Sequence, residues 1–283
     1  CFLKMKKALA DLSVQQNKME GEPVVIFDRV SLSFDDSVVL RDLSFTLRTG
    51  HTKIFLGASG AGKSTVLKLI LGLLKQDSGT IQVNGEKIDE MDEVALMKVR
   101  SDFGMVFQEG ALFDSLTVAE NVGYKLYEEM RWPFSEWYSR VEEVLGFIGL
   151  SDFIEKMPSD LSGGQRRRVA IARAMAAKPR VLLYDEPTTG LDPITASTVD
   201  DEIIKLRDIE NVTSIVVTHQ LRDAFYVATH EARHDSNSVD IVKAGEDKVE
   251  QAEFIMLQDG RIHFEGTAEE LRESTDHYLR TFL

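Results

Sequence analysis

The sequence predicts an α/β fold with a largely parallel central sheet and helices on both of its faces. Short apolar segments at 53–56, 102–107, 181–184 and 214–218 have the length and composition of buried strands. Apolar residues at helical spacing follow, as in the stretch 64–74. Strands that alternate with helices form parallel sheets, so we expect ligands at the carboxyl ends of these strands. The residues there are Gly57, Gln108, Asp185 and His219.

Antiparallel hairpins are expected near the two ends of the predicted domain, which covers residues 23–283. In each hairpin, alternating apolar and polar residues or a short apolar strand border a turn of polar or glycine residues. The predicted strands are 24–34 with 39–47, then 80–83, and finally 254–257 with 261–265. We therefore expect a mixed sheet core with an antiparallel β subdomain beside it.

A helical subdomain is expected at 109–167, because this block contains few strand formers. Within it, the stretches 116–130, 133–148 and 152–157 show helical patterns. The block lies between two groups of polar strand-end residues. We therefore interpret it as an insertion into the α/β core.

Two further segments lie outside this pattern. Residues 1–22 mix lysine with apolar residues and are expected to form an N-terminal extension. Cys1 has no preceding Met, so a fragment, a processed product and another start, at Met5 or Met19, all stay open. The polar, acid-rich segment 229–253 is expected to be a surface insertion.

The composition limits the classes of partner. The formal net charge is −14, which disfavours general binding to nucleic acid or to anionic lipid surfaces. No apolar run approaches the roughly 20 residues that a membrane span needs. A single Cys excludes a disulfide within the chain. If the protein serves a membrane, we expect it to do so through a partner.

A glycine loop between a strand and a helix fits the pattern G-x-x-x-x-G-K-S/T of phosphate-binding loops. Glycines let backbone N–H groups close around phosphates, and the following helix directs its positive end at the same anion. Lys63 would reach the β- and γ-phosphates, and the Ser64 hydroxyl would bind Mg²⁺. The loop residues are Gly57, Ala58, Ser59, Gly60, Ala61, Gly62, Lys63, Ser64 and Thr65.

Two carboxylates end the apolar strand 181–184. Asp185 is placed to hold Mg²⁺, and Glu186 to orient or deprotonate an attacking water. A second anion site is suggested by the two glycines after Ser162, which is expected to cap a helix at 166–177. The basic run at 166–168 is interpreted as a solvated helix face.

The sequence Leu161-Ser162-Gly163-Gly164-Gln165 resembles the signature motif of ATP-binding-cassette (ABC) ATPases. The family's other landmarks occur in the family's order, over about residues 24–254 and the terminal hairpin. They are the phosphate loop, Gln108, the signature, Asp185-Glu186, the segment Thr189 to Pro193, and His219. The resemblance implies the ABC-ATPase type of P-loop NTPase fold and hydrolysis of ATP with Mg²⁺.

The resemblance also implies roles for single residues. Two chains would pair head to tail as a homodimer, so that each ATP lies between one chain's phosphate loop and the signature of the other. Phe34 would stack on adenine, and Asp192 would link the two sites. Gln108 would contact Mg²⁺ and the water, and His219 the γ-phosphate. The implied signature contacts are Ser162, Gly163, Gly164 and Gln165.

A narrower resemblance concerns the segments 107–118 and 184–196. They are similar to the branch of ABC ATPases that includes the Mla, Mce-associated and organic-solvent-resistance proteins. This similarity implies a membrane permease, an MCE-domain lipid-binding protein and transport of phospholipid or another hydrophobic molecule, at the cytoplasmic face of the inner membrane. Residues 111–113 would receive a permease helix, and internal packing of these residues stays open beside that interpretation.

Three other functions are considered. An importer ATPase for a small polar solute would carry nearly the same motifs. An ABC protein of ribosomes or DNA is disfavoured by the single cassette and by the missing heptads. The sequence His230-Glu231-Ala232-Arg233-His234 matches the zinc-protease pattern H-E-x-x-H, but five residues with two fixed types are weak evidence.

Overall fold

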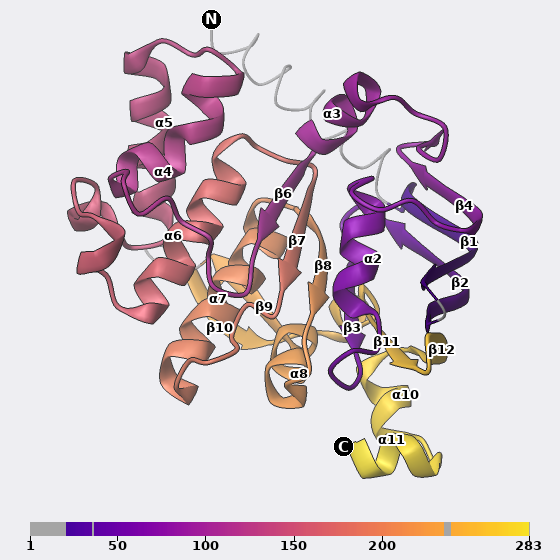
Figure 1. Ribbon diagram of the computed structural model, residues 1–283. Coiled ribbons are helices and arrows are strands. Elements are labelled where there is room, and N and C mark those ends of the chain that lie inside the picture. Colours follow the sequence, from indigo (N-terminus) through magenta and orange to yellow (C-terminus); the bar gives the residue numbers. More distant parts are fainter. Residues whose placement is uncertain (1–20, 36, 235–238, 283) are drawn as a thin grey trace, which may run out of the picture.

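The computed structural model describes residues 21–35, 37–234 and 239–282, so the predicted extension lies almost wholly outside the described residues. Figure 1 shows a central sheet with helices on both faces, an antiparallel sheet on one side and a helical block on the other. Within the described residues, no helix combines the length and the hydrophobicity that crossing a membrane requires.

The central sheet has six strands in the order β12-β11-β3-β8-β7-β6. All neighbours pair in parallel except β11 with β12, as predicted. Their bounds are β3 Thr52–Leu56, β6 Phe103–Val106, β7 Val181–Asp185, β8 Thr213–Val217, β11 Ala252–Gln258 and β12 Arg261–Gly266. The inner strands β3 and β8 are buried along their whole length, which explains their continuous apolar sequence.

Helices cover both faces of this sheet (Figure 1). The helices outside the block between β6 and β7 are α2 Lys63–Ile70, α3 Glu93–Ser101, α7 Pro193–Ile209, α8 Leu221–Thr229, α9 Glu246–Val249, α10 Ala268–Glu273 and α11 His277–Phe282. The helix after the glycine loop ends at Ile70 rather than at the predicted Leu74. Gly72 adopts a φ of +60°, which favours the end of a helix at this point.

The predicted antiparallel subdomain is confirmed. Its order is β2-β1-β4-β5, with bounds β1 Pro23–Phe34, β2 Ser37–Arg48, β4 Ser78–Val83 and β5 Glu86–Lys87. The rings of Phe27 and Phe45 stack at 4.6 Å between centroids, and Phe55 of β3 meets Phe45 edge to face. These buried aromatic contacts attach the antiparallel sheet to the central sheet.

The block between β6 and β7 is helical. It contains α4 Val118–Tyr124, the π-helical turn Lys125–Glu129, α5 Phe134–Phe147, the 3₁₀ turns Ser151–Phe153 and Pro158–Asp160, and α6 Gly163–Ala176. The helix expected at 152–157 is wrong, because only the two short 3₁₀ turns form near it. Met157 precedes Pro158 and is extended, as the proline ring disfavours a helical residue before it.

The segment expected as a surface insertion contains the hairpin β9 His230–His234 with β10 Val239–Lys243. The hairpin is attached to α7, because Arg207 donates a hydrogen bond to the carbonyl of His230 at 2.6 Å. Arg207 also donates to the carbonyl of Val227 in α8 at 2.7 Å. Asp208 Oδ2 accepts a hydrogen bond from the backbone N–H of Ala232 at 2.8 Å.

The H-E-x-x-H sequence therefore lies on a strand rather than on a helix. Residues four apart on a strand are separated by roughly 13 Å, too far for two ligands of one zinc ion. Moreover, the described part of the chain contains no group of three acidic, His or Cys side chains that could hold a metal. The zinc-protease reading, already disfavoured, is excluded by this geometry.

Two buried carboxyl groups face each other between α7 and α8. Asp200 and Asp223 are 2 and 3% exposed. Burial, and then the charge of Asp223, raise the pKa of Asp200 to about 8, against a smaller opposite effect of Arg222. Asp201, on the same helix as Asp200, adds to the increase.

Because the pKa of Asp200 is raised, we expect the stability of the folded chain to depend on pH. An unfolded Asp ionises near pH 4, whereas folded Asp200 holds its proton up to about pH 8, so its contribution to stability falls as pH rises between these values. We expect Asp200→Asn to raise the melting temperature, with an increase that grows from pH 5 to pH 8.5. Glu210→Gln, at an exposed position, is the control. A pH-independent difference for Asp200→Asn would contradict this account.

Candidate functional site

A cavity of about 710 Å³ lies at the carboxyl ends of β3, β7 and β8. It combines residues from distant parts of the sequence. Its lining consists of Phe34, Val39, Gly57, Ala58, Ser59, Gly60, Gly62, Lys63, Ser64, Thr65, Gln108, Glu186, His219 and Phe282. The structure thus brings together the predicted glycine loop and the polar residues that follow three other strands.

The loop between β3 and α2 depends on glycine at two positions. Gly57 has a φ of +148°, and a Cβ there would lie 2.6 Å from the carbonyl oxygen of Leu257. Gly62 has a φ of +96°, and a Cβ there would lie 2.7 Å from Leu40. Only glycine fits these positions, and the loop curves tightly along the cavity wall.

Lys63 is a buried cation within this loop. Its side chain is 6% exposed, and its ammonium group donates to the carbonyls of Gly57 and Ala58 at 2.7 and 3.0 Å. Burial lowers the pKa of Lys63, while the nearby charges of Glu186 and Asp185 oppose that change. The ammonium group thus lies in a site that favours an anionic ligand.

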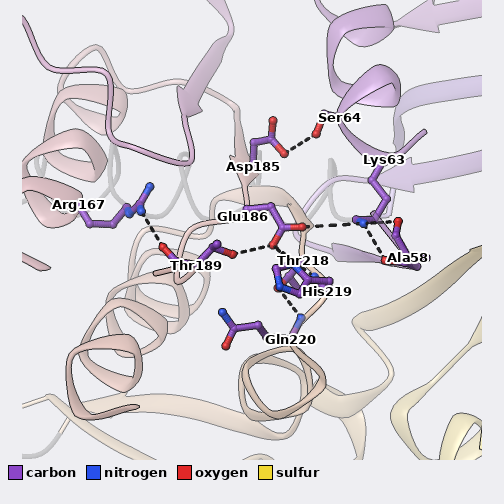
Figure 2. Close-up of polar contacts among 11 residues, drawn as sticks. Ala58, Lys63, Ser64, Arg167, Asp185, Glu186, Thr189, Thr218, His219 and Gln220 are labelled. Carbon is purple, nitrogen blue, oxygen red and sulfur yellow. Dashed lines mark hydrogen bonds and ion pairs between the residues drawn. The ribbon is translucent and has the colours of Figure 1, made fainter. Parts of the chain in front are cut away.

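Asp185 and Ser64 form a pair of oxygen ligands. The Ser64 hydroxyl donates to Asp185 Oδ1 at 2.8 Å (Figure 2). Burial raises the pKa of Asp185, and the hydrogen bond from Ser64 acts in the opposite direction. A half-buried carboxylate beside a hydroxyl is a donor set that suits a hard divalent cation.

The carboxylate of Glu186 is the centre of the polar contacts in Figure 2. It accepts a hydrogen bond from the Thr189 hydroxyl at 2.9 Å and lies 2.7 Å from Nδ1 of His219. Its second oxygen is 3.9 Å from the ammonium nitrogen of Lys63. Its φ is +52°, and its N–H bonds to Val217 O at 2.8 Å. The backbone and three side chains therefore hold this carboxylate in place.

The signature residues do not line this cavity. The Ser162 side chain accepts a hydrogen bond from the backbone N–H of Gln165, which confirms its predicted role as a helix cap, although α6 begins at Gly163 rather than at Arg166. A Cβ on Gly164 would lie 2.1 Å from Thr195 of α7. Asp192 caps α7 through its hydrogen bonds to Ile194 and Thr195. Ser162, Gly163 and Asp192 remain exposed.

The basic run at 166–168 is only partly the solvated face that was expected, because Arg166 is exposed, Arg168 is half-buried and Arg167 is buried. Arg167 is 6% exposed and donates to the carbonyls of Phe107 and Thr189 at 2.7 and 3.3 Å. Arg173, two turns further on, donates to Gly110 and Ala111 at 2.8 and 2.7 Å. Both side chains hold the loop that carries Gln108, so α6 connects the signature to that loop.

Three residues of the site were missed by the sequence analysis. Thr189 was noted as a family landmark, but its bond to Glu186 was not foreseen. Val39 and Phe282 line the cavity from β2 and α11. No local pattern distinguishes a Phe in the last helix from a core residue, so Phe282 is visible only in the folded chain.

Comparisons with known proteins agree with this geometry. The family model described as ABC transporter matches residues 40–189. The chloroplastic protein Trigalactosyldiacylglycerol 3 of Arabidopsis thaliana is 35% identical over 88% of this chain and 70% of its own length. A probable amino-acid ABC transporter ATP-binding protein of Sinorhizobium fredii is 32% identical over 93% of this chain and 99% of its own length. The methionine import ATP-binding protein MetN of Bifidobacterium longum is 39% identical over 71% of this chain and 52% of its own length.

Solved structures agree as well. The dimeric post-hydrolysis state of the ATP-binding cassette MJ0796, bound to ADP and phosphate, superposes with a TM-score of 0.70. It is 30% identical and covers 86% of this chain and 98% of its own. The protein cbiO1 of Clostridium perfringens, part of the ABC transporter complex cbiONQ, has a TM-score of 0.74 at 25% identity. The match covers 92% of this chain and 98% of cbiO1.

Because the guanidinium of Arg167 is buried and hydrogen-bonded, we expect its removal to lower the stability of the fold. Arg167→Met keeps an apolar stem but leaves two carbonyl groups without their donor. We expect the free energy of unfolding, measured in urea, to fall by about 1–3 kcal/mol. The control is Arg166→Met, whose exposed side chain has one bond to Leu161, and we expect it to cost less than about 1 kcal/mol. Equal losses in the two variants would contradict the structural role of Arg167.

Proposed function

We propose a function that proceeds from one fact: the chain belongs to the ABC transporter family of ATP-binding proteins. It has the ABC ATPase cassette fold and is an ATP-binding subunit of that type. We propose that it hydrolyses ATP as a homodimer and thereby drives a membrane permease that moves a lipid or another hydrophobic molecule. The observation that carries this proposal is the convergence of Lys63, Glu186 and His219 at one cavity, with Asp185 bonded to Ser64 of its lining.

The cavity divides the work of hydrolysis among its residues. The loop N–H groups and the ammonium group of Lys63 bind the β- and γ-phosphates. The carboxylate of Glu186 takes a proton from the attacking water while the water oxygen bonds to the γ-phosphorus. The bond to the bridging oxygen breaks, which leaves ADP and phosphate. His219, bonded to Glu186 at 2.7 Å, holds that carboxylate and faces the γ-phosphate.

The same residues fit Mg²⁺. Ser64 and Asp185 are neighbouring oxygen donors, and Gln108 lines the cavity with an amide oxygen. Mg²⁺ is usually held by one or two protein oxygens together with substrate phosphates. When bound, the ion would neutralise charge on the phosphates, and Asp185, Ser64 and Gln108 would hold it.

Dimerisation follows from the place of the signature. Ser162 and Gly163 are exposed at the start of α6, outside the cavity of their own chain. A helix start of this kind binds anions. Near it, Ile194 is 82% exposed, which is unusual for an isoleucine and suits a covered surface. A second chain placed head to tail would bring these groups to the γ-phosphate, and the dimeric cassette MJ0796 supports such pairing.

A permease would contact the helical block. Phe113 is 43% exposed. Its ring is tilted by 38° against that of Tyr124, at 4.7 Å between centroids, and the guanidinium carbon of Arg173 lies 5.9 Å from its centroid. Leu112 is half-buried against the core. Because Arg167 and Arg173 bind the backbone on both sides of Gln108, a push on this surface reaches the ATP site through α6.

The transported molecule is the finer part of the proposal. The similarity of 107–118 and 184–196 to the Mla and Mce-associated branch favours a phospholipid, with an MCE-domain protein as further partner. A relative named for trigalactosyldiacylglycerol, a lipid, supports this reading. Relatives named for methionine and amino-acid import favour the second candidate, an importer of small polar solutes.

The assignment of Glu186 is tested by Glu186→Gln, which keeps the size of the side chain but removes the base. We expect ATP hydrolysis to fall at least ~100-fold. ATP binding should persist, and light scattering should show a dimer stabilised by ATP. Glu142→Gln, on an exposed helix face, serves as control. Hydrolysis at the wild-type rate in Glu186→Gln would refute the role of Glu186.

The permease surface is tested by the double substitution Leu112→Glu and Phe113→Glu. We expect the tagged variant to lose the permease on purification from native membranes while it still binds ATP, because charged groups cannot enter an apolar contact. Met97→Glu, at an exposed residue of α3, is the control. Unchanged recovery of the permease would exclude this surface.

The same purification distinguishes the two candidate functions. Mass spectrometry of the wild-type complex should detect a multispanning permease, an MCE-domain protein and phospholipid. A permease with a soluble solute-binding protein would instead establish the small-solute importer. Recovery of ribosomes or nucleic acid would contradict both transport proposals.

A further inference from the structure

We propose that Phe282 of α11 forms a second aromatic wall for the adenine base, which would then lie between the rings of Phe34 and Phe282. This inference rests on the proposed function, in which the cavity binds ATP with Phe34 against the base. It adds a contact from the C-terminal helix, far in the sequence from the glycine loop.

The cavity lining combines two chemically different kinds of surface. The glycine loop with Lys63 suits phosphates. The apolar part of the lining is provided by Phe34, Val39 and Phe282. Phe34 is 46% exposed, although a Phe on a strand is usually buried. An exposed ring at a cavity wall is a surface on which a flat base can stack.

Phe282 reaches this cavity from a helix that is firmly held. Leu279 is 2% exposed and belongs to the main hydrophobic core. Asp276 accepts hydrogen bonds from the backbone N–H of Leu279 and from Nε2 of His263, both at 3.0 Å. The Tyr278 ring meets the His263 ring edge to face at 5.1 Å between centroids. Through His263, α11 is fixed to β12.

The position of β12 explains why α11 lies beside the cavity. The turn between β11 and β12 contacts β2, because the backbone N–H of Arg41 donates to Gly260 at 2.8 Å. Val39, which lines the cavity, is two residues from that contact. Figure 1 shows α10 and α11, in yellow, at the same end of the molecule as the loop before α2. The C-terminal hairpin thus contacts β2, and Phe282 lines the same cavity as Val39 and Phe34.

The partial burial of Phe282 suits a ring that borders the cavity rather than one that fills it. Its ring is half-buried against the core, so one side is supported by protein while the other lines the cavity. A supported ring loses little conformational entropy when it stacks on a ligand. Stacking is tolerant of the base, so Phe282 should strengthen binding of purine nucleotides in general.

The test compares ATP with inorganic tripolyphosphate, which has the phosphates but no base. Calorimetric titrations with Mg²⁺ use the full chain as wild type, Phe282→Ala, Phe282→Leu and the control Thr281→Ala at an exposed neighbour. We expect Phe282→Ala to weaken ATP binding about 10-fold and to leave tripolyphosphate binding unchanged. Phe282→Leu should recover part of the loss, and Thr281→Ala should behave as wild type.

A second variant reports the contact directly. Phe282→Trp should keep the affinity for ATP, and its added fluorescence should be quenched by ATP but not by tripolyphosphate. The two natural residues, Trp132 and Trp137, lie in the helical block and give the wild-type background.

Several results would overturn the inference. Phe282→Ala with unchanged or tighter ATP binding would show that Phe282 is neutral or blocks the base. An equal loss for ATP and tripolyphosphate would show a general disturbance of the cavity. If wild type itself bound no ATP, the proposed function would fail rather than this contact.

Discussion

The parallel pairing of β3, β8 and β7 is the constraint on which the site depends. Parallel neighbours point their carboxyl ends to the same edge, so the residues after these strands meet although the glycine loop lies more than 100 positions before Glu186 and His219. The backbone continues this alignment beyond the strands. Glu186 N–H bonds to Val217 O at 2.8 Å, and Thr218 N–H bonds to Phe55 O at 3.0 Å. These bonds set Glu186 and His219 beside the glycine loop.

Burial gives the aligned residues their chemical character. Burial lowers the pKa of Lys63 and raises the pKa of Asp185, so it favours the neutral form of both side chains. A triphosphate with a divalent cation supplies the opposite charges that each of them lacks. The free energy spent on burying these groups in the folded chain is thereby recovered in part on binding. The glycine loop needs Gly57 and Gly62 because a Cβ at either position would collide with Leu257 or Leu40.

The helix α6 connects this centre with the outer parts of the molecule. Its start carries the signature serine, and its arginines bind the loop on both sides of Gln108. A movement of the helical block therefore changes the place of Gln108 and of the signature together. This arrangement gives a physical route between the proposed permease surface near Phe113 and the cavity.

The sheet, both hairpins and most cavity residues were predictable, because buried strands and the glycine loop have strong local patterns. Arg167 was not, since its burial results from packing of α6 against two loops that are distant in sequence. Phe282 was missed for the same reason. The strand at 230–234 was hidden by its polar sequence, as its pairing with β10 and its contacts with α7 are tertiary. The signature was found by resemblance, and its role between two chains cannot be read from one chain.

That role is the central claim, and an experimental structure of the Glu186→Gln chain with ATP and Mg²⁺ tests it most directly. We predict two chains paired head to tail, with each γ-phosphate between Lys63 of one chain and Ser162 of the partner subunit. A structure with ATP bound in each separate chain, and with Ser162 exposed to solvent, would contradict the account.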